Sequence, residues 1–245
     1  MFLYTIHGQC CTITGITNPN TTKIVIPEFI QDYKVVDIAA IAFKNNMAVE
    51  EVHMPDAIRN IYTEAFYGCI NLRVVHFYKS TNPSNRICFH RAVFQNCIRL
   101  RDILFDNPTV LEFMADTTRC FQDCHSLKNI EGYFSWSIPG HTFHNCYELD
   151  NLVFKQEILN DITFAGTSLI GCRCLKNVTL LGNLSPFTPT SVLKKLSKMN
   201  IKCPKNSNVA SLMTPGANIQ FLQNVSLPTD KIPDWVKAYI PIPVF

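Results

Sequence analysis

Short segments in which apolar and polar residues alternate recur along most of the chain. Their apolar pairs are Val52/Met54, Val75/Phe77, Ile103/Phe105, Leu152/Phe154 and Val178/Leu180. An alternation with a period of two is typical of a β-strand with one buried face. The pattern therefore predicts a series of short, half-buried strands.

Each of these segments follows a recurring motif, Phe-x-x-Cys-x-x-Leu. Its copies are Phe66/Cys69/Leu72, Phe94/Cys97/Leu100, Phe121/Cys124/Leu127 and Phe143/Cys146/Leu149, with the variants Phe43/Asn46/Val49 and Leu169/Cys172/Leu175. The first residues of successive copies are 22–28 residues apart, which is the period of a solenoid coil and not of a helical-hairpin repeat. Because the same strand returns once per coil, we expect parallel neighbours about 4.8 Å apart, so that six coils span roughly 30 Å.

A second apolar position lies five residues before the first residue of most motif copies. It is occupied by Ile38, Ile61, Phe89, Ile138 and Phe164. We expect these side chains to pack on the wall opposite the strands, with the motif phenylalanine, cysteine and leucine filling the interior of each coil.

The chain contains 11 cysteines, an odd number that cannot pair completely within one molecule. Five of them occupy the motif position, where a small thiol is readily buried and stacked along a solenoid axis. We therefore expect a structural, unreactive ladder of thiols. The odd total and the lack of a secretory signal favour a reducing compartment.

The repeat resembles a known family. The pattern Ile-x-x-x-Ala-Phe-x-x-Cys-x-x-Leu-x-x-Val-x-Phe/Met, clearest in residues 35–55 and 58–77, is similar to the BspA-like leucine-rich repeats, and the resemblance extends from residue 4 to about residue 181. It implies a fold that is mostly β with short helices: a right-handed leucine-rich-repeat solenoid with a parallel β-sheet and terminal caps. The resemblance also implies protein–protein interaction, often adhesion to host or cell-surface components.

The repeats divide the chain into four parts. We expect an N-terminal β cap in residues 1–34, about six BspA-like repeats in 35–181, a C-terminal capping segment in 182–226 and an apolar, proline-containing tail in 227–245. In the capping segment, Thr188 and Pro189 predict the cap and first position of an amphipathic helix ending near Met199. A strand at residues 200–204 and a short helix and strand within 206–219 should follow.

The tail is too apolar to be a solvated linker, and its prolines forbid a long helix. It either folds back on its own solenoid or buries in another chain, which would give a homo- or hetero-oligomer.

Composition and charge exclude several classes of function. The chain has 245 residues, 47% of them hydrophobic, and a net charge of only +3. This charge is too small and too dispersed for a nucleic-acid partner, and no apolar run is long enough for a membrane span. The first residues lack the features of a secretory signal, so we expect a cytoplasmic protein or a virion component more than a secreted one.

Candidate chemistry is sparse. Cys120, Cys124, His125, His141, His144 and Cys146 are close in sequence. However, the motif cysteines face inward while His125 and His144 should face solvent, so four ligands are not expected to converge on zinc. No nucleophile elbow, phosphate-binding glycine loop or zinc-protease motif occurs. We expect no enzyme activity, no metal and no cofactor.

The surface of the strands is the remaining candidate site. Two columns of residues should face outward, and if this sheet forms the concave face they are the default binding surface of a solenoid. From these columns and the tail we select candidate partner-binding residues: His53, His76, Asp102, Glu131, Asn151, Trp235 and Tyr239. The run Asn129, Asn151 and Asn177 is equally consistent with a stabilising side-chain ladder.

Two hypotheses of function follow. In the first, the chain is a non-enzymatic recognition module that binds a protein or glycan through the strand columns. In the second, it is a structural subunit of a virion or an intracellular assembly, held through residues 232–245.

Overall fold

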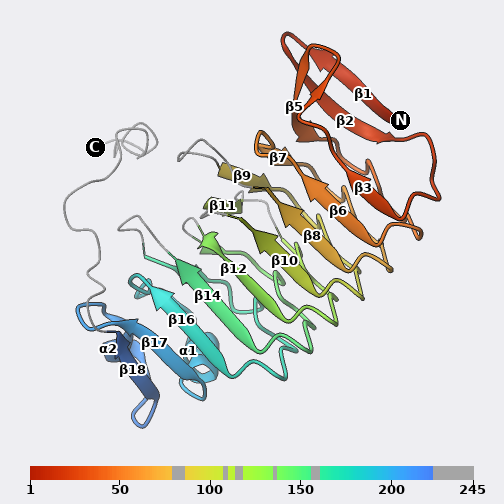
Figure 1. Ribbon diagram of the computed structural model, residues 1–245. Coiled ribbons are helices and arrows are strands. Elements are labelled where there is room, and N and C mark those ends of the chain that lie inside the picture. The colour runs from red at the N-terminus through yellow and green to blue at the C-terminus, as the bar shows by residue number, and fades with distance from the viewer. Residues whose placement is uncertain (79–85, 107–109, 114–117, 135–136, 156–160, 223–245) are drawn as a thin grey trace.

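The protein is an elongated solenoid in which parallel strands lie side by side from one end to the other (Figure 1). The computed structural model describes residues 1–78, 86–106, 110–113, 118–134, 137–155 and 161–222. All cross-coil strand pairs are parallel, while the N-terminal region adds antiparallel pairs. The sequence predicts a mostly β solenoid with short helices, and the structure confirms it.

One wall of the solenoid is a long parallel sheet, called here the long sheet. It consists of β3 (Lys23–Val25), β6 (Glu51–Met54), β8 (Val74–Phe77), β10 (Asp102–Phe105), β12 (Asn129–Phe134), β14 (Asn151–Lys155), β16 (Asn177–Leu181), β17 (Asn200–Pro204) and β18 (Asn218–Leu222). The strands expected from the alternating segments are confirmed. Their inward residues, such as Val52, Val75 and Leu152, are buried because they face the coil interior.

A second wall carries another series of strands and the N-terminal cap. They are β1 (Phe2–His7), β2 (Cys10–Ile16), β4 (Phe29–Ile30), β5 (Tyr33–Ile38), β7 (Asn60–Ile61), β9 (Arg86–Phe89) and β11 (Val110–Phe113), with β13 (Ser137–Ile138) and β15 (Thr163–Phe164) pairing separately. Ile38, Ile61 and Phe89 lie in one buried row, as do Ile138 and Phe164, so the predicted second apolar position is confirmed. The sequence pattern offered no apolar residue of this row for the coil of Phe121. In that coil Phe113 pairs with Phe89 and completes the row.

Tight turns form the third wall, and each coil repeats the same backbone geometry. The residue before the motif cysteine has a positive φ in every coil, and this residue is Asn45, Gly68, Asn96, Asp123, Asn145 or Gly171. Asn, Asp and Gly tolerate this left-handed conformation better than other residues. Gly68 and Gly171 also lie against Asn45 and Asn145 of the preceding coil, where a Cβ atom would clash.

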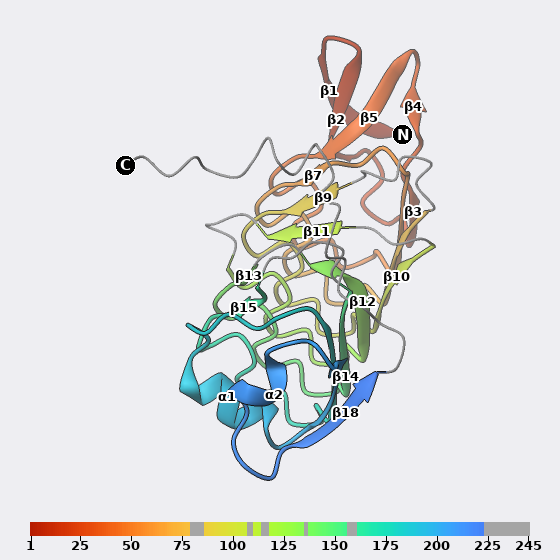
Figure 2. The same cartoon turned by 90° about the vertical axis from the view of Figure 1, so that its left-hand side faces the viewer.

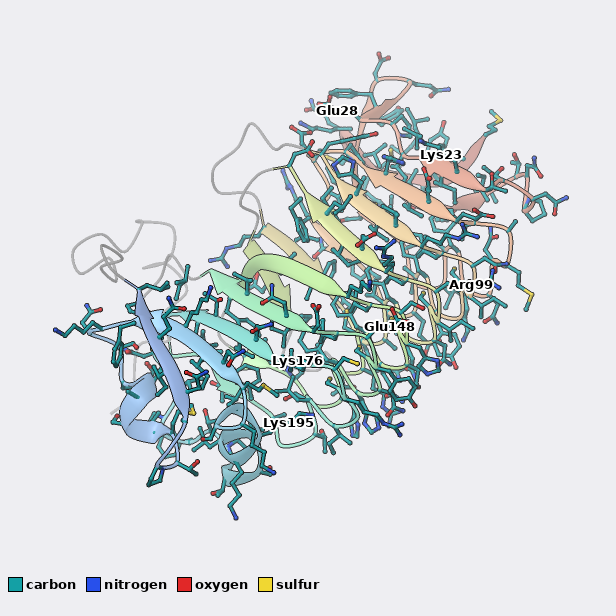
Figure 3. The ribbon with its side chains drawn as sticks, turned by 60° about the horizontal axis from the view of Figure 1, so that its bottom comes forward. Lys23, Glu28, Arg99, Glu148, Lys176 and Lys195 are labelled. Atoms are coloured by element: carbon teal, nitrogen blue, oxygen red, sulfur yellow. The ribbon has the colours of Figure 1, made fainter. Side chains whose placement is uncertain are left out.

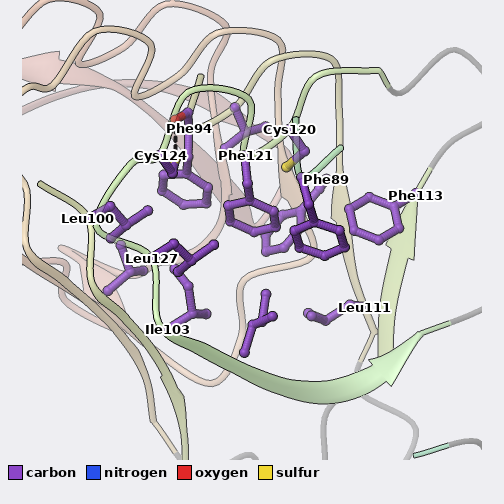
Figure 4. Close-up of a cluster of buried hydrophobic side chains, with 14 of the residues drawn as sticks. Phe89, Phe94, Leu100, Ile103, Leu111, Phe113, Cys120, Phe121, Cys124 and Leu127 are labelled. Atoms are coloured by element: carbon purple, nitrogen blue, oxygen red, sulfur yellow. Dashed lines mark hydrogen bonds between the residues drawn. The ribbon is translucent and has the colours of Figure 1, made fainter. Parts of the chain in front are cut away.

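The core is a stack of motif side chains. Phe43, Phe66, Phe94, Phe121 and Phe143 stack face to face, with centroid distances from 5.0 to 5.8 Å. Phe89 meets Phe94 and Phe121 edge to face from the second wall (Figure 4). Large, flat rings therefore fill each coil and hold it in register with the next one.

The motif cysteines also form a ladder, as expected, and each thiol has a defined partner. The sulfur atoms of Cys69, Cys97, Cys124, Cys146 and Cys172 donate to the carbonyl of the first motif residue in the preceding coil, at 2.9–3.2 Å. The dashed line in Figure 4 marks the bond from Cys124 to Phe94. All five thiols are buried and free of disulfides.

Polar side chains replace the thiols at both ends of the ladder. At the first copy, Asn46 has no earlier motif carbonyl to meet, and its Oδ1 accepts from the backbone N–H groups of Ala48 and Val49. At the other end, the Lys195 ammonium donates to the carbonyls of Leu169 and Cys172, the latter at 3.2 Å. Lys195 thus takes the position that a thiol of a further coil would occupy.

Two helices cover the end of the array remote from the N-terminal hairpin (Figure 2): α1 (Thr190–Leu196) and α2 (Val209–Leu212). The predicted helix exists, but its start and end were wrong. Pro189 occupies the N-cap, Thr188 makes no capping bond, and the helix stops at Leu196. The chain must turn after Leu196 to enter β17, which has the predicted bounds.

The tail expected in residues 227–245 lies outside the described residues. In the part of the chain that the structure describes, no helix is long and apolar enough to cross a membrane.

Candidate binding face of the long sheet

The outward residues of the long sheet form two columns in strict register. His53 lies opposite His76, and His76 lies opposite Leu104. In the neighbouring column, Glu51 lies opposite Val74, and Val74 lies opposite Asp102. The register places the predicted candidates His53, His76 and Asp102 on one face because each coil advances by one strand.

An aromatic cluster occupies the N-terminal half of this face. The rings of His53, His76 and Tyr78 contact one another, with centroid distances of 4.9–5.7 Å. The Tyr78 hydroxyl lies 2.9 Å from His53 Nδ1. The three rings support one another laterally, and we call them the His–Tyr cluster.

Carboxylates flank the His–Tyr cluster. Asp106 Oδ1 lies 2.6 Å from His76 Nε2, and Glu51 Oε2 lies 3.4 Å from His53 Nε2. Glu51 also contacts Lys23 at 3.1 Å. Lys23 lies in β3, the first strand of the long sheet, and marks this end of the sheet in Figure 3. The hydrogen bonds from Lys23 and His53 lower the pKa of Glu51 below its usual value, so this carboxylate stays charged at neutral pH.

Exposed apolar atoms border the same cluster. Leu104 is 46% exposed and Tyr78 is 37% exposed. Val25 lies opposite His53 on the neighbouring strand β3 and is also exposed. The N-terminal half of the face therefore combines apolar contact area with side chains held in place by hydrogen bonds.

The C-terminal half of the face differs because asparagines fill its first column. Asn151 pairs in register with Asn177, and Asn177 pairs with Asn200. The side-chain amides of Asn200 and Asn218 donate to Asn177 and Asn200 at 2.9 and 2.7 Å. The structure thus shows a side-chain ladder through Asn177, Asn200 and Asn218. The ladder predicted through Asn129, Asn151 and Asn177 stays a prediction, because the side chain of Asn129 lies outside the described residues.

Three of the predicted candidates cannot be placed fully. The backbone of Glu131 lies in β12 opposite Val153, but its side chain is outside the described residues. Trp235 and Tyr239 of the tail are outside them as well.

The sequence interpretation missed Tyr78 and Asp106. Both continue the outward alternation of their strands by two residues, from His76 to Tyr78 and from Leu104 to Asp106. Extending the period-two pattern past the buried pairs would have found them.

The histidines and cysteines considered for zinc do not converge. Cys120, Cys124 and Cys146 are buried in the core, and burial raises the pKa of each thiol. His141 and His144 lie outside the core and contact each other, Nδ1 to Nδ1, at 2.8 Å. Within the described residues, no group of three or more His, Cys, Asp or Glu side chains is placed to hold a metal ion.

Comparison with known proteins agrees with this architecture of parallel coils and stacked motif residues. The BspA type leucine rich repeat region matches residues 36–170 and 83–198, with six copies. The chain belongs to this family of leucine-rich-repeat proteins.

A solved structure of a leucine-rich-repeat protein shows the same fold. The chain is similar to a leucine-rich-repeat protein of T. pallidum, with a TM-score of 0.61 and 21% identity, over 81% of this chain and 87% of that chain. A leucine-rich cell surface protein of Faecalibacterium prausnitzii matches with a TM-score of 0.48 and 20% identity, over 87% of this chain and 52% of that chain. No curated protein matches.

Membership of the family supports a coarse statement of function. Repeat proteins of this type serve surface or protein interactions and are typically non-enzymatic.

Proposed function

We propose that the chain is a non-enzymatic recognition module that binds a protein partner through the N-terminal half of the long-sheet face. The observation that carries the proposal is the His–Tyr cluster, a group of rings on an outward strand face with exposed Leu104 beside it. Aromatic side chains and apolar area surrounded by polar groups are typical of the residues that dominate binding energy at protein interfaces.

The rigidity of the cluster supports this use. His53 and His76 each contact a carboxylate, and His53 also contacts the Tyr78 hydroxyl. Side chains that are already held in one conformation lose less entropy on binding, so more of their contact energy appears as affinity. The parallel sheet beneath them provides a fixed backbone.

Adhesion is the setting that the family most directly suggests for such a module, and we propose it as the biological role. The alternative, a structural subunit held through residues 232–245, concerns a segment outside the described residues. The His–Tyr cluster favours the recognition module.

To test this, the full chain first captures its partner from native cells by photo-crosslinking. The partner is then purified for binding measurements. Replacing both Tyr78 and Leu104 by alanine should weaken binding of this partner by at least about tenfold, because two contact side chains of an interface centre are removed. Titration by biolayer interferometry measures the change.

A matched control uses two exposed apolar residues elsewhere. Ile170→Ala with Phe187→Ala removes at least as much exposed apolar area from the turn wall and the C-terminal cap, since Phe187 is 88% exposed, and affinity should not change. Equal affinities for the two double variants would refute a binding role for the long-sheet face.

A further inference from the structure

The outward side of β10 presents an acid, an apolar residue and an acid in turn. Asp102 and Leu104 alternate with Ile103 and Phe105, which pack against the core. Asp106 directly follows the strand, and its carboxylate reaches His76 on the neighbouring strand. Four residues of extended chain separate the two aspartates, which therefore lie about 13 Å apart with Leu104 between them.

The charges around the His–Tyr cluster are mostly negative. Within the described residues, the outward side chains of β3, β6, β8 and β10 and the residues that directly follow β8 and β10 supply three carboxylates and one ammonium. The carboxylates belong to Glu51, Asp102 and Asp106, and the ammonium belongs to Lys23, which contacts Glu51. Arg101 lies 3.9 Å from Asp102 and is 60% exposed, a geometry that contributes little. With neutral imidazoles, the rim of the cluster is acidic.

The hydrogen bonds of the His–Tyr cluster also turn acceptors outward. A neutral imidazole carries hydrogen on one ring nitrogen only. With this hydrogen on Nε2 of His53, where Glu51 lies at 3.4 Å, Nδ1 accepts from the Tyr78 hydroxyl at 2.9 Å. The Tyr78 oxygen then offers only lone pairs to a partner, as the carboxylates do. Groups that donate hydrogen bonds and carry positive charge complement this rim.

We propose that the partner of this face contributes an extended, basic segment in which an apolar residue has an arginine two positions before it and another two positions after it. The two arginines then match the spacing of Asp102 and Asp106, because both chains are extended, and the apolar residue meets Leu104. Arginine suits this site better than lysine. Its planar guanidinium binds a carboxylate through two parallel hydrogen bonds and stacks on a ring such as that of Tyr78. The inference rests on the proposed function and specifies the partner of the same site.

A defined peptide tests both the charge and the spacing. The probe is Gly-Arg-Thr-Leu-Thr-Arg-Gly, and the control peptide has glutamate in place of both arginines. Nuclear magnetic resonance titration of the full chain, up to millimolar peptide, follows the backbone amides of β8 and β10. We expect saturable shifts with the arginine peptide and binding of the glutamate peptide that is weaker by at least about tenfold, because like charges then meet. The absence of shifts, or equal affinity for the two peptides, would overturn the inference.

A charge variant of the protein tests the same contact from the other side. Asp102→Asn with Asp106→Asn removes both charges at nearly constant shape, and it should weaken binding of the arginine peptide by at least about tenfold. The matched control, Asp32→Asn with Glu148→Gln, removes the same charge from exposed positions in the turn between β4 and β5 and in the segment before β14 (Figure 3). It should leave affinity unchanged. Equal affinities of the two double variants would show that the aspartates of β10 do not select the peptide.

The captured partner separates failure of this inference from failure of the proposed function. If Tyr78→Ala with Leu104→Ala weakens binding of the partner while Asp102→Asn with Asp106→Asn does not, the recognition face stands and the basic segment is wrong. If neither double variant weakens binding, the recognition face itself is wrong. Weaker binding in both supports the two proposals together.

Discussion

Each motif cysteine has a more specific role than filling space. Its thiol donates to a carbonyl of the preceding coil that also accepts a backbone N–H within its own turn, so the thiol is the second donor to a buried carbonyl that has two lone pairs. Burial raises the pKa of Cys69 to about 12 and that of Cys172 to about 11. These thiols therefore remain protonated donors at neutral pH.

Replacement of one ladder cysteine tests this role. Cys124→Ala should lower the free energy of unfolding by about 1–3 kcal/mol, because the Phe94 carbonyl loses its thiol donor and a small cavity forms. Urea denaturation under reducing conditions measures the change. Cys174→Ala is the matched control, since Cys174 is exposed, and it should change the free energy by less than about 0.5 kcal/mol. Similar losses in both variants would argue against a stabilising ladder.

The sequence predicted the burial of the cysteines but not their hydrogen bonds. Spacing alone indicated that Cys97 and Cys124 occupy the same inward position. The acceptor of each thiol, however, belongs to the preceding coil, and only the stacking of coils brings the two atoms together.

At the scale of elements, the strands were easier to predict than the turns and the cap. Alternating pairs such as Val75/Phe77 gave the strands because half-burial is a local pattern. The residue before each motif cysteine is always Asn, Asp or Gly, and this restriction indicates its left-handed backbone. A second left-handed position, occupied by residues such as Ile41 and Glu64, carried no such signal in its residue types, although its N–H groups also donate to carbonyls of the next coil.

Helix α1 ends the thiol ladder through one side chain, that of Lys195. Lys195→Met keeps most of the apolar stem but removes the ammonium from the carbonyls of Leu169 and Cys172. We expect a loss of about 1–3 kcal/mol in the free energy of unfolding, as for a hydrogen bond to a charged group.

Lys194→Met is the control for this prediction. Lys194 lies in the same helix but is exposed, so its replacement should leave the urea midpoint nearly unchanged. If the two variants were equally stable, the cap would act through helix packing and not through Lys195.

At the scale of the whole molecule, the stacked thiols couple stability to alkaline pH. Below about pH 9 the thiols are protonated in both the folded and the unfolded chain, so they add no pH dependence. Above the ordinary thiol pKa of 9.0, the unfolded chain releases these protons, while burial holds the folded pKa of Cys69 near 12. The free energy of unfolding should therefore fall as pH rises from 9 to 11, by up to about 1.4 kcal/mol per pH unit for each ladder thiol.

Urea titrations at pH 7, 9, 10 and 11 measure this dependence. Other groups also titrate in this range, so the decisive comparison is between the wild type and Cys124→Ala. The variant should show a shallower fall, because it lacks one buried thiol. Parallel curves for the two proteins would contradict a contribution from the ladder.

The sequence by itself determined the repeat, the strand positions, the buried residues and the family, because each follows from a pattern that returns within one coil. The tertiary structure alone decided which side chains of different coils meet. His53, His76 and Tyr78 form one cluster only because parallel register places successive strands side by side. Asn46 and Lys195 lie at the two ends of the thiol ladder only because no motif copy precedes Asn46 and none follows Leu169 and Cys172. Contacts across coils depend on how the coils stack, and that information is spread over residues too far apart in sequence to show a local pattern.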